Sequence, residues 1–273
     1  MDGTVPVVRR PAAVLALVAA TASLSSGCER DTVTLSFQPT EGSQLEYETT
    51  VESVTVTQLP GRVAVTREDR TRLDAHQEVL DVGDDGVLVE VSLSRPGIGT
   101  RTFTMRFDRA AQLTRVERVE GIPAAALGDL GLSEIFPAAA GAPPDRPLAP
   151  GDRWAIDDEV QLAGDDQPAR LRGEGRLVEV GVEDGEDVAT VRSTASLPIH
   201  TTTSTTRGTQ SLTGTQVTVA TATYDLDGGA LRRASAVTTA TFLLVLGPPE
   251  GRGGDAIEGT LSVHIRSEVR RTG

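Results

Sequence analysis

Apolar and polar residues alternate with a period of two along most of the chain beyond residue 44. The alternation is clearest in residues 45–51, 87–93 and 103–107, where valine, leucine, phenylalanine or another strand-forming residue recurs at every second position. Three further runs are 178–182, 217–219 and 261–269. Successive side chains of a β-strand point to opposite faces, so this period places the apolar residues on one face. The pattern predicts an all-β protein whose long strands are buried on one side.

Aspartate-glycine dipeptides lie between these runs, at residues 85–86, 184–185 and 227–228. Such dipeptides supply the positive φ angles that tight hairpin turns require. Hairpins that follow one another along the chain form a mainly antiparallel meander. We therefore expect a long-stranded curved sheet or half-barrel.

Two sections of the chain resemble each other in order and spacing. Residues 79–92 (VLDVGDDGVLVEVS) are similar to 177–191 (LVEVGVEDGEDVATV), and 107–115 (FDRAAQLTR) are similar to 224–233 (YDLDGGALRR). We interpret the similarity as a duplication that produces two similar halves. The alternative is a chance similarity between hairpins that share an aspartate-glycine turn.

The duplication predicts which positions are equivalent. Gly86 and Gly185 should lie at equivalent turns, and Phe107 and Tyr224 at equivalent strand positions. This follows because a shift of one residue in a strand would move every buried side chain to the opposite face.

The centre of the chain interrupts the alternation and separates the two β units, 28–121 and 151–273. Residues 122–136 (IPAAALGDLGLSEIF) have alanine and leucine at helical spacing, with a proline suited to a first helical turn. We expect a short central helical segment here, packed on the inner face of the sheet. Residues 137–150 are rich in proline and predict an extended connector. The whole interruption therefore spans 122–150.

The first residues read as an export signal. Arg9 and Arg10 precede the apolar stretch 11–22, which is shorter than the roughly 20 residues that span a bilayer. Small residues then lead into Cys28, the single cysteine of the chain. This order resembles the lipobox of bacterial lipoproteins, which implies that 1–27 is a signal peptide and that Cys28 carries the lipid, including palmitate.

The lipobox has one departure from its usual form, since Ser25 stands where leucine is typical and Leu24 lies one residue earlier. The cleavage register therefore stays open. The alternative is an ordinary secretory signal with Cys28 as a free thiol. A lipid on Cys28 would hold the protein at the cell membrane or the outer membrane, with its folded part facing the periplasm or the exterior.

A short motif opens the second β unit. Pro150-Gly151-Asp152-x-Trp154, after the proline-rich connector, resembles uncharacterised envelope lipoproteins of bacteria. The long strands with one helical interruption are also similar, at the level of architecture, to the LolA/LolB and LppX-type carriers. That second resemblance implies a curved sheet that holds acyl chains, and it transfers no individual residue. Trp154 itself we expect to be a core anchor.

The negative net charge of the chain limits the kinds of molecule that it can bind. The net charge is −13 and lysine is absent, whereas nucleic acids are bound by clusters of basic residues. We therefore expect no nucleic-acid partner. With one cysteine, no disulfide can form within the chain.

Candidate chemistry is sparse. His76, His200 and His264 lack metal-spaced neighbours, and a zinc site would need all three brought together. No nucleophile elbow, phosphate-binding loop or dinucleotide fingerprint is present in the sequence. We expect no enzyme activity, no catalytic residue, no metal and no cofactor.

Two compositional features leave alternatives open. Acidic clusters at 84–85, 157–159, 165–166 and 183–184 suit solvated turns, with calcium binding as the alternative. The threonine-rich stretch 201–223 favours a long exposed hairpin, with O-glycosylation as the alternative.

Two functional hypotheses follow. The first is an envelope lipoprotein that binds or carries an apolar or lipid ligand on a curved sheet that aromatic residues, only 3% of the chain, leave incompletely filled. The second is a structural or protein-interaction lipoprotein with a filled core and no small-molecule site. An apolar cavity would favour the first, and an exposed apolar patch the second.

Overall fold

The structure is a computed structural model that describes residues 32–108, 113–121, 143–144, 146–160, 169–205, 208–248 and 254–273. Asp31–Gly273 make up one compact unit. Every regular element in these ranges is a β-strand. The strands are β1 (Gln44–Gln58), β2 (Val65–Gly83), β3 (Gly86–Arg95), β4 (Gly99–Phe107), β5 (Leu113–Gly121), β6 (Arg153–Val160), β7 (Ala169–Glu183), β8 (Glu186–Thr205), β9 (Gly208–Asp225), β10 (Leu231–Gly247) and β11 (Ile257–Arg271). The described residues contain no helix long and apolar enough to cross a membrane.

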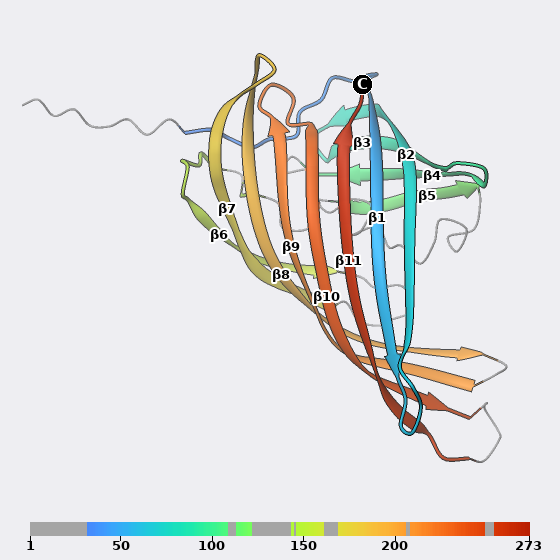
Figure 1. The fold of residues 1–273 in the computed structure, drawn as a ribbon. Coiled ribbons are helices and arrows are strands. Elements are labelled where there is room, and N and C mark those ends of the chain that lie inside the picture. Colours follow the sequence, from blue (N-terminus) through green and yellow to red (C-terminus); the bar gives the residue numbers. More distant parts are fainter. Residues whose placement is uncertain are drawn as a thin grey trace, which may run out of the picture. The chain divides into compact units, whose positions relative to one another are not determined.

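All the strands form one antiparallel sheet in the order β5-β4-β3-β2-β1-β11-β10-β9-β8-β7-β6 (Figure 1). The first and last strands, β1 and β11, pair with each other in the middle of the sheet. The edge strands β5 and β6 do not pair, so the curved sheet stays unclosed. The expected all-β, antiparallel half-barrel is confirmed.

The strand register and the burial pattern together define two faces. Tyr47 lies opposite Ala75, and Thr49 lies between Leu73 and Val269; these side chains are all buried. We call the face that carries them the inner face and the opposite one the outer face. Three of the expected alternating runs are confirmed, since the odd-numbered residues of 47–51, 87–93 and 103–107 are buried.

Of two other runs, 178–182 is partly buried only at Val180 and 217–219 was predicted on the wrong face. Val178 and Val182 of β7 are 42% and 69% exposed, whereas Leu177 is fully buried. A bulge in β7 at Leu177–Glu179 leaves Val178 outside the alternation and brings Val180 opposite the buried Ala189, where Val180 packs against the core. In β9 the inner face carries Ala220, and Val217 points outward.

The two predicted turns have closely similar surroundings. Gly83 pairs with Gly86 across the β2–β3 turn, and Glu183 pairs with Glu186 across the β7–β8 turn. Each is a two-residue turn, and in each case the preceding strand contains a bulge. Gly86 is the first residue of β3, whereas Gly185 lies within its turn, so the two glycines are offset by one position.

The aromatic positions after these hairpins are also similar. Phe107 of β4 pairs with Val87 near the start of β3, and Tyr224 of β9 pairs with Ala189 near the start of β8. Both aromatic side chains are buried. Superposition of the two β units remains a prediction.

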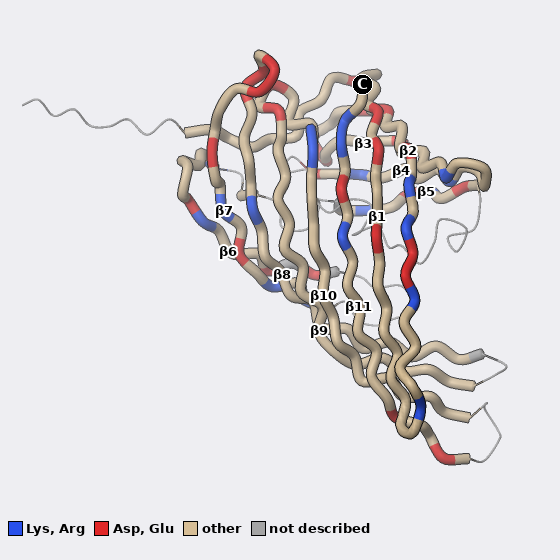
Figure 2. Tube along the Cα trace, in the orientation of Figure 1, with Lys and Arg blue, Asp and Glu red and all other residues tan. Residues whose placement is uncertain are grey.

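The two ends of the sheet differ. We call the end with the β2–β3, β7–β8 and β9–β10 turns the closed end, and the end with the β1–β2 turn the open end. Charged residues gather toward the closed end, and the strands running to the open end are mostly uncharged (Figure 2). The hydrophobic core also lies toward the closed end, which gives the long sheet a packed half and an extended half.

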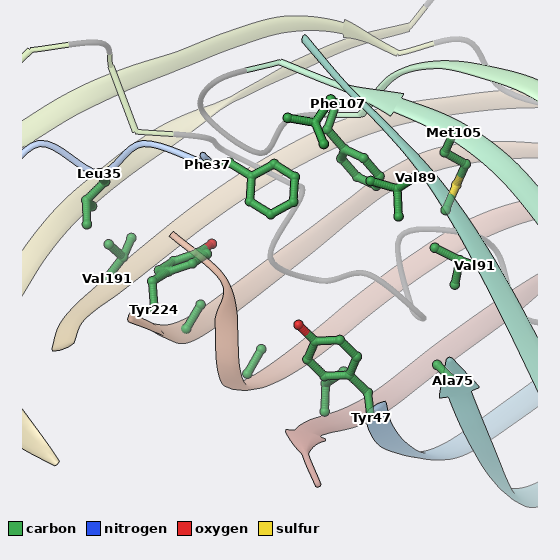
Figure 3. Close-up of a cluster of buried hydrophobic side chains, with 14 of the residues drawn as sticks. Leu35, Phe37, Tyr47, Ala75, Val89, Val91, Met105, Phe107, Val191 and Tyr224 are labelled. Atoms are coloured by element: carbon green, nitrogen blue, oxygen red, sulfur yellow. The ribbon is translucent and has the colours of Figure 1, made fainter. Parts of the chain in front are cut away.

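Residues 33–38 help to pack the closed end (Figure 3). Phe37 meets Phe107 edge to face, with ring centroids 6.1 Å apart. The Gln38 amide donates to the Gly228 carbonyl at 3.0 Å, and Val33 forms a bridge with Leu148. This N-terminal segment therefore joins the β9–β10 turn to the connector that precedes β6.

The Pro150-Gly151-Asp152 motif is a turn that docks on β7. The Gly151 amide donates to the Leu177 carbonyl at 2.8 Å, and the Leu177 amide donates to the Asp152 carbonyl at 3.0 Å. Gly151 has a φ of 98°, which explains the need for glycine. Trp154 is buried in the core, as expected. The expected helical segment 122–136 lies outside the described residues.

Candidate functional site

Small side chains line the inner face in the middle of β8 to β11. They are Ser193, Ala195, Ala220, Ala222, Ala234, Ala236, Ala240 and Ser267. Ala220 pairs with Ala236, and Ala222 with Ala234, so four methyl groups form one patch. All these side chains are buried. The inner face here is therefore a floor of methyl and hydroxymethyl groups.

Larger aliphatic side chains replace the small ones toward the open end. The half-buried ones on the inner face are Leu197, Ile199, Leu212, Leu261, Val263 and Ile265. Phe242 lies among them over Gly214, where a Cβ atom would come within 2.7 Å of its ring. The inner face of these four strands is therefore one apolar strip, from small side chains to branched ones. We call it the inner strip.

Hydroxyl groups within the inner strip are satisfied by one another. Thr218 Oγ1 and Thr238 Oγ1 lie 2.9 Å apart on neighbouring strands and share a hydrogen bond. β1 separates the strip from β2, where Arg67 and Asp69 are exposed on the inner face. The strip thus has a charged margin on β2, one strand beyond its edge.

Both tyrosines of the chain lie in the core toward the closed end. Burial raises the pKa of Tyr224 well above its ordinary value. Burial also raises the pKa of Tyr47, although the nearby Arg271 guanidinium opposes the shift. Both phenols are therefore neutral hydroxyls throughout the physiological pH range.

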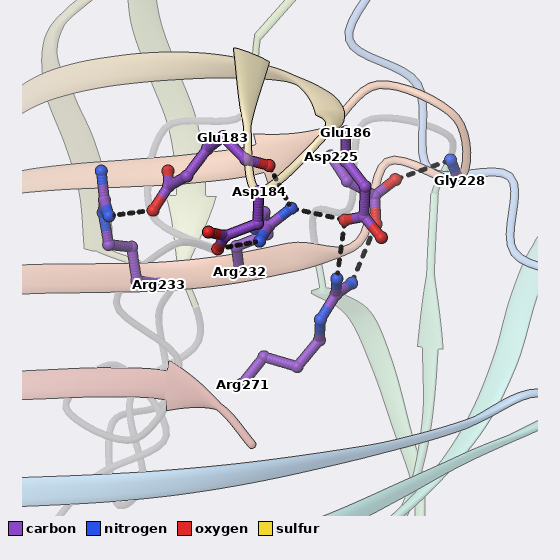
Figure 4. A network of polar contacts seen from close by, with 8 residues as sticks. All are labelled: Glu183, Asp184, Glu186, Asp225, Gly228, Arg232, Arg233 and Arg271. Carbon is purple, nitrogen blue, oxygen red and sulfur yellow. Dashed lines mark hydrogen bonds and ion pairs between the residues drawn. The ribbon is translucent and has the colours of Figure 1, made fainter. Parts of the chain in front are cut away.

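A network of ion pairs fastens the closed end (Figure 4). Arg271 pairs with Asp225 at 2.9 Å and with Glu186 at 3.2 Å. Arg232 pairs with Asp184 at 3.2 Å and also with Glu186. These residues come from the ends of β8, β9, β10 and β11 and from the β7–β8 turn. Arg271–Asp225 is the pair in which both side chains are mostly buried, whereas Asp184 and Glu186 are 82% and 51% exposed.

A hollow of about 440 Å³ lies beside this network on the outer face. Its lining includes Arg233, Arg270, Glu183 and Glu268, and Arg233 bonds Glu183 at 2.5 Å. Both signs of charge therefore line it. A polar, charge-balanced hollow does not suit an apolar molecule, so the inner strip is the better candidate for such a ligand.

The three histidines are not brought together. His76 accepts or donates a hydrogen bond with Glu46 at 2.7 Å, and His200 does so with Thr213 at 2.9 Å. His264 is exposed on β11. Within the ranges that the structure describes, no three His, Cys, Asp or Glu side chains are placed to share a metal ion.

The described acidic clusters lie at turns or in ion pairs. Residues 84–85 and 183–184 occupy turn positions or adjoin them. Asp157 bonds Arg170, and that hydrogen bond lowers the pKa of the Asp157 carboxyl. Residues 165–166 and Cys28 lie outside the described part of the chain.

The threonine-rich stretch forms the β8–β9 hairpin, so the expected hairpin is confirmed. Its outer face carries exposed hydroxyls, and Thr202 Oγ1 bonds Ser211 Oγ at 2.9 Å. O-glycosylation of this stretch remains a prediction.

The sequence reasoning missed the small-residue patch and the ion-pair network. Alanine alternates in Ala220-Thr-Ala222 and in Ala234-Ser-Ala236, which was a readable signal for a buried face of small side chains. The network had no such signal, because Arg271 and Asp225 are 46 residues apart.

Comparison with known proteins finds no protein family whose sequence pattern matches the chain. No curated protein is similar to it in sequence.

Proposed function

We propose that this protein is an envelope lipoprotein, anchored in a membrane through Cys28, that binds an acyl chain or a similar apolar molecule along the inner strip. The observation that supports the proposal is the strip itself: an unclosed, curved sheet whose inner face changes from alanine and serine to leucine, isoleucine and valine. We propose no catalytic step.

The dimensions suit a long, thin ligand. Ala222 and Leu212 lie on the same face of β9, ten residues apart, which corresponds to about 33 Å of strand. Each methylene group that leaves water on such a surface contributes about 0.8 kcal/mol. An extended hydrocarbon chain would thus gain affinity along the length of the strip without any charged contact.

The charged groups of the closed end are paired with one another, so contacts of a ligand along the inner strip would be apolar. The ion pairs of the closed end are satisfied by one another, and the phenols of Tyr47 and Tyr224 stay neutral. A charged headgroup would find its counter-charges at the margin on β2 and not within the strip.

Binding is tested with residues 31–273, which make up one compact unit. The protein is purified from a bacterial host, examined by native mass spectrometry for co-purified lipid, and titrated with a fluorescent fatty acid. We expect bound lipid or saturable uptake of the probe. Protein that carries no lipid and takes up no probe would contradict the proposal.

A matched pair of variants tests whether the ligand binds the inner face or the outer face of the sheet. Leu212→Glu introduces a charge on the inner face, whereas Leu243→Glu introduces one on the outer face, where Leu243 is 47% exposed. The two positions lie on neighbouring strands, in adjacent rungs of the sheet. Leu212→Glu should weaken probe binding at least tenfold, and Leu243→Glu should leave it unchanged.

A structural lipoprotein without a ligand is the second candidate. It is favoured by one observation, that the small side chains of the inner strip are already buried in the protein. Equal thermal stability with and without added fatty acid, together with no uptake of the probe, would favour this role, because a ligand that binds the folded state stabilises it.

A further inference from the structure

In β1 and in β8 to β11, the half of the sheet that runs to the open end is almost free of charge, whereas β2 carries Arg67, Glu68 and Asp69 there. In the described residues of 53–58, 193–205, 208–224, 234–247 and 257–265, Glu258 is the one charged side chain. Charged residues make up 24% of the whole chain, so this depletion is specific to one region. Figure 2 shows the same contrast, with red and blue segments concentrated toward the closed end.

Exposed aliphatic side chains accompany this uncharged half. Val63 and Val65, at the β1–β2 turn and the start of β2, are 88% and 66% exposed. Leu243 of β10 and Ile257 at the start of β11 are 47% and 46% exposed. We call these four residues the open-end rim. Exposed aliphatic groups that lie close together form a surface that another apolar phase can cover.

The rim residues come from neighbouring strands, with Val65 and Ile257 in inner-face register and Leu243 on the outer face. Val65 pairs with Thr57, Thr57 pairs with Leu261, and Leu261 pairs with Phe242, which precedes Leu243. Three strand spacings separate Val65 from Leu243, or about 14 Å. Ile257 pairs with Leu246 on β10. The β1–β2 turn also touches β11, since a Cβ atom on Gly259 would lie 2.7 Å from Leu59.

Polar groups near the rim are already paired with one another. Thr202 bonds Ser211, and His200 bonds Thr213, both at 2.9 Å on the outer face of the β8–β9 hairpin. A surface that satisfies its own hydroxyl groups loses less free energy when water leaves than a surface of unpaired polar groups.

From this arrangement we propose that the open-end rim docks on the surface of a lipid bilayer and inserts its aliphatic side chains among the acyl chains. The four rim side chains are aliphatic, without the aromatic anchors that are typical of protein interfaces, and Arg62 beside Val63 is the one charged residue of the β1–β2 turn. The protein is acidic and has no lysine, so attraction to anionic headgroups does not drive the contact. Docking is therefore apolar: it is as strong on zwitterionic lipid as on anionic lipid, and added salt does not weaken it.

Vesicle flotation tests the proposal with residues 31–273, which lack Cys28 and hence any anchor there. The protein is mixed with phosphatidylcholine vesicles at low and at high salt. The wild type should float with the vesicles under both conditions, and the V63E/V65E variant should float at least fivefold less. The control L80E/V82E also places two charges on exposed positions of β2, 38% and 43% exposed, toward its closed end, and should float like the wild type.

A labelled cysteine gives a second, independent measurement. Because residues 31–273 contain no cysteine, Val63→Cys and Leu80→Cys each create a single site for an environment-sensitive fluorophore. Vesicles should shift the emission at position 63 to the blue and leave that at position 80 unchanged. Wild-type protein that does not float, equal losses in the two double variants, or equal shifts at both labels would overturn the proposal.

Acyl-chain binding is measured separately, with the fatty-acid probe in solution. V63E/V65E should retain it, since neither residue belongs to the inner strip. A protein that floats but binds no fatty acid would refute the proposed function and leave the docking surface standing, whereas the reverse result would refute the docking surface alone.

Discussion

The indole of Trp154 fills the space in which a side chain on Gly175 would stand. The two residues pair across β6 and β7, and a Cβ atom on Gly175 would come within 2.2 Å of Trp154 Cε2. The tryptophan is buried with Leu177 and Leu148 in the core. The edge strand β6 is thus held on the sheet by the indole ring of Trp154, which packs directly over the backbone of Gly175.

This contact predicts the effect of enlarging Gly175. Gly175→Val forces the indole out of place and should lower the free energy of unfolding by about 1–3 kcal/mol. Gly181→Val on the same strand is the control, because no atom lies within 4 Å of a Cβ there. Urea unfolding followed by Trp154 fluorescence measures both. Equal stability of the two variants would show that the contact between Trp154 and Gly175 contributes nothing to the free energy of unfolding.

The ion-pair network predicts that breaking a buried pair lowers the free energy of unfolding more than breaking an exposed pair does. Asp225→Asn removes the charge that faces Arg271, and both side chains are at most 20% exposed. We expect a loss of about 2 kcal/mol in the free energy of unfolding. Glu52→Gln, which breaks the exposed pair with Arg70, should cost less than about 1 kcal/mol. The prediction fails if chemical denaturation shows the same cost for both.

The two buried phenols predict alkaline unfolding. Burial raises the pKa of Tyr47 and Tyr224 in the folded state, so their contribution is fully present below the ordinary tyrosine pKa of about 10 and is lost as the pH rises above it. They are the only tyrosines of the chain. Phenolate absorbance should therefore appear only together with loss of the native circular dichroism signal.

A double variant isolates that contribution. Y47F/Y224F cannot ionise at these positions, so its melting temperature should fall less between pH 9 and pH 11 than that of the wild type. A phenolate signal in protein that is still folded at pH 10 would contradict the predicted burial effect.

Lipidation of Cys28 is tested in cells with the full chain. Cys28→Ala should release the protein from membranes, and the mature wild-type protein should begin at Cys28 with two or more acyl chains in its mass spectrum. A Cys28→Ala protein that stays membrane-bound after signal cleavage, or a wild-type protein with a free thiol, would refute the anchor.

The sequence by itself determined the strands, because burial of one face imposes a period of two that can be read directly. The inward positions of Tyr47, Val89 and Met105, the two-residue turns and the role of Trp154 all follow from local patterns and turn chemistry. Only the tertiary structure decided how β7 and β9 are buried. A bulge leaves Val178 of β7 outside the alternation, and in β9 the outward valines were more conspicuous than the inward alanines. It also decided the β1–β11 pairing, the closed-end network and the open-end rim. Each of these joins residues far apart in the sequence, and their contacts depend on how the whole sheet curves and which strands become neighbours, which no local pattern encodes.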